Sequence, residues 1–437
     1  IDFINAQKQG ANAVWAPSID DIFPENPQAN FQLVVPPQLT KNLCGKNRQG
    51  HFDGVITVIA RLLSLVKPEV LVLGEKDWQQ MLIIKNFLDH YNLPINLRTI
   101  ETIRDEDGLA YSSRNKYLNP KERNQALILP KVLKQASLNF QKNKKINLNH
   151  IKTNLIQNGL EVEYLELVEP YSLVQLEPNP KPSLLAAAVR CGKTRLIDHT
   201  FLMNRKPIVA IDGPAGAGKS TVTKSFAKKL NLIYLDTGAM YRAVTLLLQQ
   251  KNIDLNDDQQ IKEILEKINL EIDQGDEGNQ KIIINGQDVT QEIRTPAITS
   301  KVSQIAKNKF VRETLTDQQR KIGDLGGIVA EGRDIGSTVF PDAELKIYLT
   351  ASVQERAIRR SLDLKEKGFD VPSIEIIEKQ INERDYIDSN REISPLIKSD
   401  DAIELITDGM SINEVIDSLI SLFETKIPQE IWPTSFQ

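Results

Sequence analysis

The sequence predicts an α/β protein with at least two domains, on three observations. Strand-like and helix-like segments alternate in two separate parts of the chain, before about residue 105 and again after residue 206. The chain has 437 residues, more than one domain usually contains. A strand, a glycine-rich loop and a helix, which together commonly open a nucleotide-binding domain, begin only at residue 208.

In the first half, short apolar segments are typical of buried strands, and longer segments with helical spacing separate them. We expect strands within residues 10–18, 68–77 and 95–105, and helices within residues 54–66 and 77–91. Alternation of this kind favours a mostly parallel sheet with helices on its faces.

The pattern changes at about Asn119. A helix is expected over residues 120–141, and strand-like segments follow at 162–170 and 183–198 after a polar stretch. This order predicts a small α+β unit. The unit is expected to end within residues 199–207, where a new strand, loop and helix begin almost without a linker.

Composition and charge restrict the class of partner. Lys and Arg number 54 against 58 Asp and Glu, and the net charge of -4 gives no reason to expect nucleic acid or a membrane surface as partner. No apolar run reaches the roughly 18 residues that a membrane span needs. Cys44 and Cys191 lie far apart without a Cys–His cluster, which indicates neither a disulfide framework nor a zinc site. We therefore expect a cytoplasmic enzyme.

Residues 213–220, GPAGAGKS, fit the phosphate-loop pattern of Gly, four residues, Gly-Lys-Ser. The glycines let backbone N–H groups turn toward phosphate oxygens, and the following helix directs its positive end at the same anion. Lys219 is expected to reach the β- and γ-phosphates of ATP or GTP, and Ser220 to bind magnesium. The expected nucleotide contacts are Gly213, Pro214, Ala215, Gly216, Ala217, Gly218, Lys219, Ser220 and Thr221.

The motifs that follow the loop resemble those of cytidylate kinases over residues 206–425. DTGAMYR at 236–242 is followed by EGRDIG at 331–336, a pair that adenylate and thymidylate kinases do not share. The resemblance implies a P-loop nucleoside-monophosphate kinase with a parallel sheet, which phosphorylates CMP or dCMP, with UMP as an alternative acceptor. It also implies a β-rich insert, for which residues 268–295 supply short strand-like segments and an Asn-Gly turn.

The same resemblance implies the roles of individual polar residues in the second half. The acceptor nucleotide would be held by Thr237, Tyr241, Arg242, Ser303, Arg312, Arg333, Asp334, Arg384 and Asp388. The residues implied to act on the transferring phosphoryl group, from the lid and a charge clamp, are Arg359, Arg360 and Arg391 together with Lys219 and Arg333. Phosphoryl transfer requires mainly positioning and positive charge, which these side chains would provide.

Three stretches of the first half carry polar residues suited to ligand binding. Residues 45–55 place Arg48 and His51 in a glycine-rich loop before a helix. Residues 74–80 lie at the carboxyl end of an expected strand, where ligands bind in open α/β sheets. Residues 112–114 join two serine hydroxyls to an arginine, which suits phosphate oxygens. Taken singly, the second stretch is more often a capping turn and the third a helix cap.

In this order and spacing, the three stretches resemble pantothenate synthetases (pantoate–β-alanine ligases) from residue 1 to about 201. The resemblance implies residues 1–203 as one enzyme, with a nucleotidyltransferase-type Rossmann part at 1–103 and a small C-terminal domain at 104–203. Residues 204–437 would then be the kinase. In the first reaction, the carboxylate of pantoate attacks the α-phosphate of ATP, which gives pantoyl adenylate and pyrophosphate. The amine of β-alanine then displaces AMP.

The resemblance also implies which residues of the first half bind ATP and pantoate. The ATP contacts would be Gly74, Glu75, Lys76, Asp77, Ile103, Tyr111, Ser112, Ser113 and Arg114. Lys76 and Arg114 would be catalytic, because negative charge develops at the α-phosphate. Gln80 would bind pantoate, with Arg48 and His51 in a loop near that site. Members of this family typically pair, so a homodimer through the first half is implied.

The family's first nucleotide motif, His-x-Gly-His, does not occur among the scattered histidines of this chain. The chain begins at Ile1 in a segment that is typical of a helix running into a strand, so we expect the Rossmann part to be incomplete, with further residues upstream. Two interpretations follow. The chain is a fused enzyme with both activities, or it is a cytidylate kinase that carries a non-catalytic, dimerising synthetase-like module.

Overall fold

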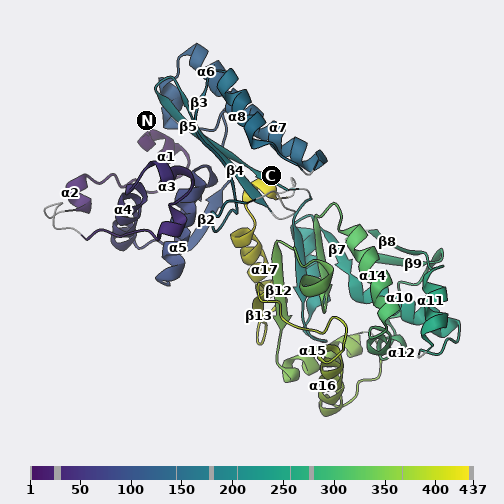
Figure 1. Ribbon diagram of the computed structural model, residues 1–437. Coiled ribbons are helices and arrows are strands. Elements are labelled where there is room, and N and C mark those ends of the chain that lie inside the picture. The colour runs from purple at the N-terminus through teal and green to yellow at the C-terminus, as the bar shows by residue number, and fades with distance from the viewer. Residues whose placement is uncertain are drawn as a thin grey trace. The chain divides into compact units, whose positions relative to one another are not determined.

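The computed structural model describes residues 2–23, 31–143, 145–176, 182–203, 205–255, 257–274, 280–366 and 368–432. The chain divides into two compact units (Figure 1). The first unit comprises Ile1–Pro178 and Ser183–Leu202, and the second comprises Asn179–Pro182 and Met203–Gln437. Each unit has its own sheets and its own hydrophobic core.

The first unit begins with a parallel strand pair and two long helices. β1 (Val70–Gly74) pairs in parallel with β2 (Asn96–Ile100), which confirms the expected parallel arrangement. α4 (His51–Val66) and α5 (Trp78–His90) pack together. Their apolar residues recur at helical spacing and form one buried face each. The core residues that the two helices contribute are Phe52, Ile56, Leu63, Ile83, Ile84 and Leu88.

One expected strand does not form. Residues 10–18 follow α1 (Asp2–Lys8) and precede α2 (Ile19–Ile22), and they are neither helix nor strand. Val14 is 37% exposed and Trp15 is 52% exposed, so the apolar side chains that suggested a buried strand are not packed. A strand needs a neighbour for its backbone hydrogen bonds, and no described residue pairs with this segment in a sheet.

The rest of the first unit is the expected α+β part. Its elements are α6 (Pro120–Ala126), α7 (Ile128–Asn143), α8 (Leu148–Gln157), β3 (Glu161–Val168), β4 (Ser183–Cys191) and β5 (Thr194–Leu202). The strands are antiparallel in the order β3-β4-β5. Leu129, Leu133 and Phe140 lie on one face of α7 and pack into the core of this part. Shorter turns are η2 (Pro37–Leu39), α3 (Leu43–Asn47), η3 (Glu75–Asp77) and η4 (Ser113–Tyr117).

The second unit is built on a parallel sheet, as the alternation of strands and helices predicted. Within the described residues its strand order is β13-β12-β6-β11-β7. The strands are β6 (Ile208–Asp212), β7 (Ile233–Asp236), β11 (Ile328–Gly332), β12 (Leu345–Thr350) and β13 (Ile403–Ile406). Every residue of β6 is buried. A strand that is covered on both faces needs such a continuous apolar run instead of alternation.

Helices cover both faces of this sheet. Val209 and Ile211 pack with α9 (Lys219–Lys229) and α17 (Ile412–Lys426), whereas Ile208 packs on the opposite face with α10 (Thr237–Gln250) and α14 (Lys309–Ile322). The remaining helical segments are α11 (Asp258–Leu265), η6 (Glu292–Arg294), α12 (Pro296–Thr299), α13 (Val302–Ile305), η7 (Ile335–Val339), α15 (Val353–Glu366), α16 (Ile374–Ser389) and η8 (Gln429–Ile431).

The expected β-rich insert is present in the second unit. β8 (Leu270–Gln274), β9 (Gln280–Ile284) and β10 (Gln287–Asp288) pair antiparallel. Between β9 and β10, Asn285 and Gly286 have φ of 49° and 82°. Two-residue hairpin turns of type I′ require positive φ at both central residues, and Asn-Gly adopts it with little strain.

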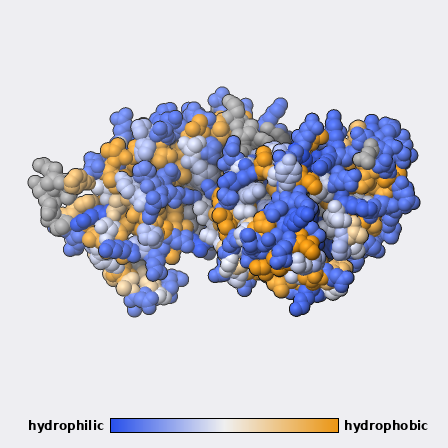
Figure 2. Space-filling view, turned by 90° about the horizontal axis from the view of Figure 1, so that it is seen from below, coloured by the Kyte–Doolittle hydropathy of each residue, from blue (hydrophilic) through white to orange (hydrophobic). Residues whose placement is uncertain are grey.

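Polar and apolar residues are interspersed on the face of the molecule seen in Figure 2. Among the residues that the structure describes, none of the helices is both long and apolar enough to cross a membrane.

Candidate active sites

The phosphate loop of the second unit joins β6 to α9. Gly216 and Gly218 have φ of 76° and 82°, where residues with a side chain are strained. A Cβ on Gly213 would lie 2.0 Å from the backbone oxygen of Leu349 on β12. The sequence therefore folds this loop tightly against the sheet, and α9 begins at Lys219 with its first N–H groups available to an anion.

The ammonium group of Lys219 folds back onto the loop. Its Nζ donates to the backbone oxygens of Gly213 at 2.8 Å and Pro214 at 2.7 Å. Burial lowers the pKa of Lys219 well below its usual range, and the charge of Arg333 lowers it further, whereas Glu331 raises it. A bound phosphate would offset the repulsion and favour the charged ammonium.

Ser220, the second residue of α9, is hydrogen-bonded to a buried carboxylate. Its Oγ donates to Oε1 of Glu331 at 2.5 Å, and the hydroxyl of Tyr234 donates to the same oxygen at 2.7 Å. Burial raises the pKa of Glu331, and the charge of Asp236 raises it further. Oε2 of Glu331 is buried and has no hydrogen-bond partner among the described residues. Sequence reasoning missed Glu331, although it is the first residue of the EGRDIG motif.

A group of charged side chains is buried beside α14. Arg312 pairs with Oδ2 of Asp334 at 2.8 Å, and Arg391 approaches Oδ1 of the same residue at 3.4 Å. The Arg312 guanidinium lies over the ring of Tyr241 at 5.6 Å from its centre. Buried ion pairs contribute little net stability, because desolvation offsets their attraction. The structure thus brings together four of the residues that the sequence predicted for the acceptor nucleotide and the clamp.

A second cluster holds more positive than negative charge. Arg242 pairs with Asp236 at 2.8 Å, and Arg333 pairs with Asp388 at 3.0 Å. Arg384 makes no hydrogen bond or ion pair with any described residue, and its Nε is buried. Burial lowers the pKa of Arg384 to about 10, and Arg333 and Arg242 contribute to the lowering. The excess of buried positive charge in this cluster favours an anionic ligand.

Two hydroxyl residues expected at the acceptor site are both buried. Thr237 Oγ1 donates to the backbone oxygen of Glu331 at 2.7 Å, which ties the start of α10 to β11. Ser303 lies on α13 and is buried.

Of the arginines that the sequence predicted for the lid, one reaches the phosphate loop. Arg359 donates to the backbone oxygens of Thr407 at 2.7 Å and Ala217 at 3.3 Å. Arg360 pairs instead with Asp363 on its own helix at 3.2 Å. Arg391, expected in the same clamp, belongs to the buried group around Asp334 described above.

Sequence reasoning missed an arginine that connects the loop to α15 and α16. Arg356 donates from Nη1 to the backbone oxygen of Ala215 at 3.0 Å and to Asp385 at 2.5 Å. The other oxygen of Asp385 accepts from the N–H of Ala215 at 3.4 Å. Arg356 and Arg359 are three positions apart, which places them on one helix face. That spacing within ERAIRR was the signal that could have identified Arg356.

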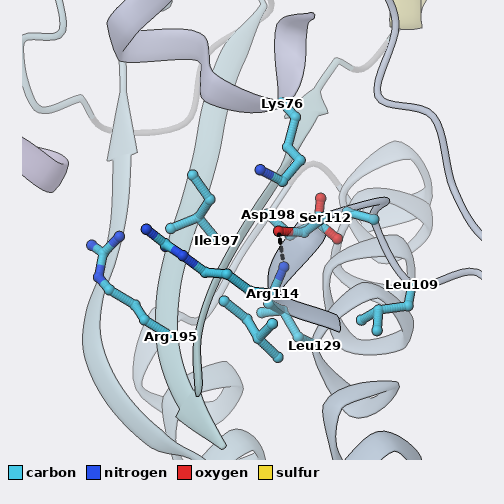
Figure 3. A pocket seen from close by; sticks show the side chains of 10 residues that line it. Lys76, Leu109, Ser112, Arg114, Leu129, Arg195, Ile197 and Asp198 are labelled. Carbon is cyan, nitrogen blue, oxygen red and sulfur yellow. Dashed lines mark hydrogen bonds between the residues drawn. The ribbon is translucent and has the colours of Figure 1, made fainter. Parts of the chain in front are cut away.

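In the first unit, a pocket brings together two of the three predicted stretches (Figure 3). Lys76, Ser112 and Arg114 line it together with Arg195 and Asp198 of β5. β5 lies against both η3 and η4, and therefore collects residues that are far apart in sequence. The Oγ of Ser112 accepts from the N–H of Arg114 at 3.2 Å, so the predicted helix cap is also present.

The turn after β1 has side chains of two kinds. Lys76 approaches Asp77 at 3.2 Å, with the Asp77 side chain half exposed. Glu75 is buried and accepts from the Thr99 hydroxyl at 2.8 Å, which joins the ends of β1 and β2. Gly74 ends β1 and leads directly into this turn.

Ile103 and Tyr111 lie outside the pocket. They are 63% and 67% exposed, and the N–H of Tyr111 donates to the backbone oxygen of Ile103 at 2.8 Å. Arg104 between them forms two hydrogen bonds with the buried carboxylate of Asp198, at 2.7 and 2.9 Å. Ser113 begins η4.

The third predicted stretch is electrostatically coupled to the pocket. Burial lowers the pKa of His51, and the charges of Arg48, Arg195 and Arg114 lower it further. Arg195, which sequence reasoning missed, pairs with Glu163 at 2.7 Å. Its segment indicated only a strand, so nothing in the local pattern pointed to a site.

Two neighbouring glutamines of α5 differ in their surroundings. Gln79 is buried, and its side-chain amide donates to the backbone oxygens of Leu39 at 2.8 Å and Asn42 at 3.0 Å. Gln80, the predicted pantoate ligand, is half-buried and makes no hydrogen bond with any residue that the structure describes. Gln79 therefore holds the chain before α4, and Gln80 is available to a ligand.

Fold and sites together define two enzyme classes in one polypeptide. The parallel sheet with a phosphate loop and buried arginines is that of a P-loop kinase, and the first unit is an α/β enzyme with a basic pocket beyond the carboxyl end of β1. A cytidylate kinase family model matches residues 209–425, and a pantoate-beta-alanine ligase model matches residues 1–201.

Comparison with known proteins identifies the family. Proteins named bifunctional pantoate ligase/cytidylate kinase from two strains of Prochlorococcus marinus are 58% and 56% identical over 98% of this chain, and the matches cover 83% and 88% of their own lengths. The crystal structure of pantothenate synthetase from Thermus thermophilus is 31% identical, with 46% of this chain and 72% of that chain covered and a TM-score of 0.42. The chain belongs to the bifunctional pantoate ligase/cytidylate kinase family.

Proposed function

We propose that residues 204–437 transfer the γ-phosphoryl group of ATP to CMP or dCMP, and that residues 1–203 join pantoate to β-alanine through pantoyl adenylate. The kinase proposal rests on one observation above all. Arg384 is a largely buried guanidinium with no hydrogen-bond or ion-pair partner among the described residues, and Arg333 and Arg242 lie nearby. Such a cluster favours an anionic ligand, and the phosphate of CMP is the anion that the family's substrate carries.

In the kinase reaction an oxygen of the CMP phosphate attacks the γ-phosphorus of ATP, and ADP leaves. Lys219 and the N–H groups of the loop would hold the β- and γ-phosphates. Arg333 and Arg384 would hold the acceptor phosphate, and Arg359 would add positive charge near the end of the loop. Because Arg333 and Arg359 are already held by protein contacts, little reorganisation of these two side chains is needed as charge moves.

The nucleoside of CMP would occupy the second group of buried charges. Arg312 and Arg391 hold Asp334 from two sides, which presents polar groups of fixed orientation. Discrimination of cytosine by hydrogen bonds requires such fixed partners, since an unpaired buried polar group is costly. The residues assigned to the nucleoside and its phosphate are Thr237, Tyr241, Arg242, Ser303, Arg312, Asp334, Arg384, Asp388 and Arg391.

Magnesium is part of the proposal, because both families use ATP. Ser220 and Glu331 would hold it, a hydroxyl and a carboxylate of the kind that magnesium takes together with phosphate oxygens. The buried Oε2 of Glu331, without a partner among the described residues, supports this fit. When bound, the ion neutralises negative charge on the phosphates.

In the first unit, we assign the pocket to the adenylation step. The carboxylate of pantoate attacks the α-phosphorus of ATP and pyrophosphate leaves; the amine of β-alanine then attacks the acyl carbon and AMP leaves. Lys76 and Arg114 would stabilise charge at the α-phosphate. The other residues assigned to ATP or pantoate are Gly74, Glu75, Asp77, Ile103, Tyr111, Ser112, Ser113, Gln80, Arg48 and His51.

We also propose a cytoplasmic location and a homodimer formed through the first unit. The location is supported by Cys44 and Cys191, which are both free thiols. The dimer follows from the family resemblance of residues 1–203, and sedimentation of the purified chain tests it. A monomer at micromolar concentration would refute the dimer.

Both activities can be assayed in one tube with ATP, CMP, pantoate and β-alanine, with CDP and pantothenate separated by mass spectrometry. Lys219→Ala is expected to abolish CDP and to leave pantothenate, and Lys76→Ala is expected to do the reverse, so each variant is the control for the other. CDP formation near the parent rate in Lys219→Ala would contradict the phosphate-loop assignment. CDP without pantothenate from the unmodified chain would assign the first unit as a non-catalytic module.

A further inference from the structure

We propose that Tyr234 is a positioning residue of the kinase site, which fixes the carboxylate of Glu331 so that this carboxylate orients Ser220 for binding of the magnesium–nucleotide complex. The inference rests on the proposed kinase function. It adds a residue that lies outside the phosphate loop and outside both quoted kinase motifs.

The three residues come from three different elements. Tyr234 lies on β7 and Glu331 on the adjacent parallel strand β11, whereas Ser220 lies in the first turn of α9. Tyr234 and Ser220 donate to one oxygen of Glu331, at 2.7 and 2.5 Å. Glu331 is almost fully buried, and its second oxygen has no hydrogen-bond partner among the described residues. The two oxygens of this carboxylate therefore differ, because Oε1 accepts both hydrogen bonds and Oε2 accepts none from the described residues.

This distinction matters for a metal-binding hydroxyl. A serine hydroxyl can offer a lone pair to a cation only if its O–H bond points away from that cation. In this structure the O–H of Ser220 donates a hydrogen bond to Oε1 of Glu331. The terminal torsion of a glutamate is broad, so a carboxylate held by one donor alone can rotate. The Tyr234 hydroxyl, which approaches from β7, supplies the second donor and restricts this rotation. Partners of metal ligands commonly tune metal affinity in this way.

The ring of Tyr234 has a separate role, which the hydroxyl does not share. It packs in the core between α9 and the sheet, beside Phe226 and Val329. Phenylalanine fills the same space, so Tyr234→Phe keeps the ring and removes the hydroxyl, with its bond to Glu331 and its contact with Ser220.

The test uses the full chain and a probe specific to the kinase site, adenosine and cytidine joined through five phosphates. Its affinity is measured by calorimetry in excess magnesium and in EDTA. We expect Tyr234→Phe to bind the probe within about twofold of the parent chain in EDTA, and to lose about tenfold or more of the magnesium-dependent gain. The melting temperature and the KM for CMP are expected to change little, while the magnesium concentration for half-maximal CDP formation rises.

Two further variants connect the effect to Glu331. Glu331→Gln is expected to lose the magnesium-dependent gain, and adding Tyr234→Phe to it is expected to cost nothing more, because both act through one carboxylate. Tyr91→Phe removes an exposed hydroxyl of the first unit and serves as the matched control.

The possible outcomes test the role of Tyr234 and the proposed kinase function separately. If the parent chain neither binds the probe nor forms CDP, the proposed kinase function is wrong. If the parent chain does both, and Tyr234→Phe keeps the full magnesium-dependent gain or loses affinity equally with and without magnesium, the positioning role of Tyr234 is wrong. Additive losses in the double variant would overturn it as well.

Discussion

Replacing Arg384 by methionine is expected to make the second unit more stable and unable to bind CMP. Methionine retains the unbranched apolar part of the side chain and removes its charge. In the structure this guanidinium has no hydrogen-bond or ion-pair partner among the described residues, so its burial has not been compensated. The change therefore separates stability from function at a single side chain.

The size of the effect follows from the pKa. Burial, with Arg333 as the next cause, lowers the pKa of Arg384 to about 10. A fall of about two and a half in pKa corresponds to about 3 kcal/mol. Because the folded-state pKa is the lower one, this destabilisation applies in full at any pH well below 10 and is lost as the pH rises through that value. The attraction to Asp388 is already included in this pKa, and the partial exposure of Arg384 reduces the net gain to about 1 to 2 kcal/mol.

The assay is calorimetric melting of the full chain, with and without CMP. A gain of about 1 to 2 kcal/mol corresponds to a rise of roughly 2 to 8 °C for a unit of this size. CMP is expected to raise the melting temperature of the parent chain, because a ligand stabilises the folded state to which it binds. It is expected to leave the melting temperature of the variant unchanged, since the variant is not expected to bind CMP. Arg294→Met, at an exposed arginine of the same unit, is expected to shift stability by less than about half a kcal/mol.

Either of two results would refute the reasoning. A lower melting temperature in Arg384→Met would mean that the guanidinium stabilises the unit without ligand. A CMP-dependent rise equal to that of the parent chain would mean that the phosphate of CMP does not bind at this cluster.

Three further predictions concern other contacts. Asp198→Asn, which removes the charge facing Arg104, is expected to lower the free energy of unfolding of the first unit by about 2 to 4 kcal/mol, as measured by urea titration. A change below about 0.5 kcal/mol would contradict the importance of this pair. NMR titration of His51 is expected to give a pKa below that of free histidine. The first unit therefore loses stability as the pH falls from the unfolded-state pKa of His51 toward its folded-state pKa. Inorganic pyrophosphate is expected to raise the folded-state pKa, because its negative charge offsets that of the nearby arginines. Arg356→Lys, which cannot make the same set of contacts to Ala215 and the lid, is expected to raise the KM for ATP about tenfold and leave the KM for CMP unchanged, as steady-state CDP formation would show.

The parts that the sequence predicted best are those in which the backbone itself fixes the structure. The loop at 213–220 needs glycines because Gly216 and Gly218 have φ of 76° and 82°, where a residue with a side chain is strained. The turn at Asn285 and Gly286 likewise needs two residues that tolerate positive φ. In both cases the constraint lies within a few consecutive residues, so it is written in the local sequence.

The parts that the sequence did not predict depend on contacts between distant segments. Glu331 and Tyr234 meet because β11 and β7 are neighbours, a strand order that local patterns do not specify. Residues 10–18 have the composition of a strand, but no described residue pairs with them in a sheet. The strand predicted from their composition is therefore not formed. Arg195 has no local motif at all. It joins the pocket only because β5 lies against the turns that carry Lys76 and Arg114.

The two proposed ATP sites differ for the same reason. In the kinase, backbone N–H groups of one short loop are suited to bind phosphate, so a contiguous motif identifies the site and tolerates few changes within it. In the first unit, the pocket is assembled from side chains on separated elements, of which the segments of Lys76 and Arg114 each resemble an ordinary turn or cap and that of Arg195 an ordinary strand. A site of that kind is recognised in a sequence only when its scattered pieces are taken together. The geometry of this pocket also depends on ion pairs such as that of Arg104 with Asp198, and neither residue belongs to a recognisable motif. Damage to the first site can therefore arise from many residues that never contact a substrate, whereas damage to the second is expected to concentrate in the loop, the arginines that face it and the few side chains, such as Tyr234, that position them.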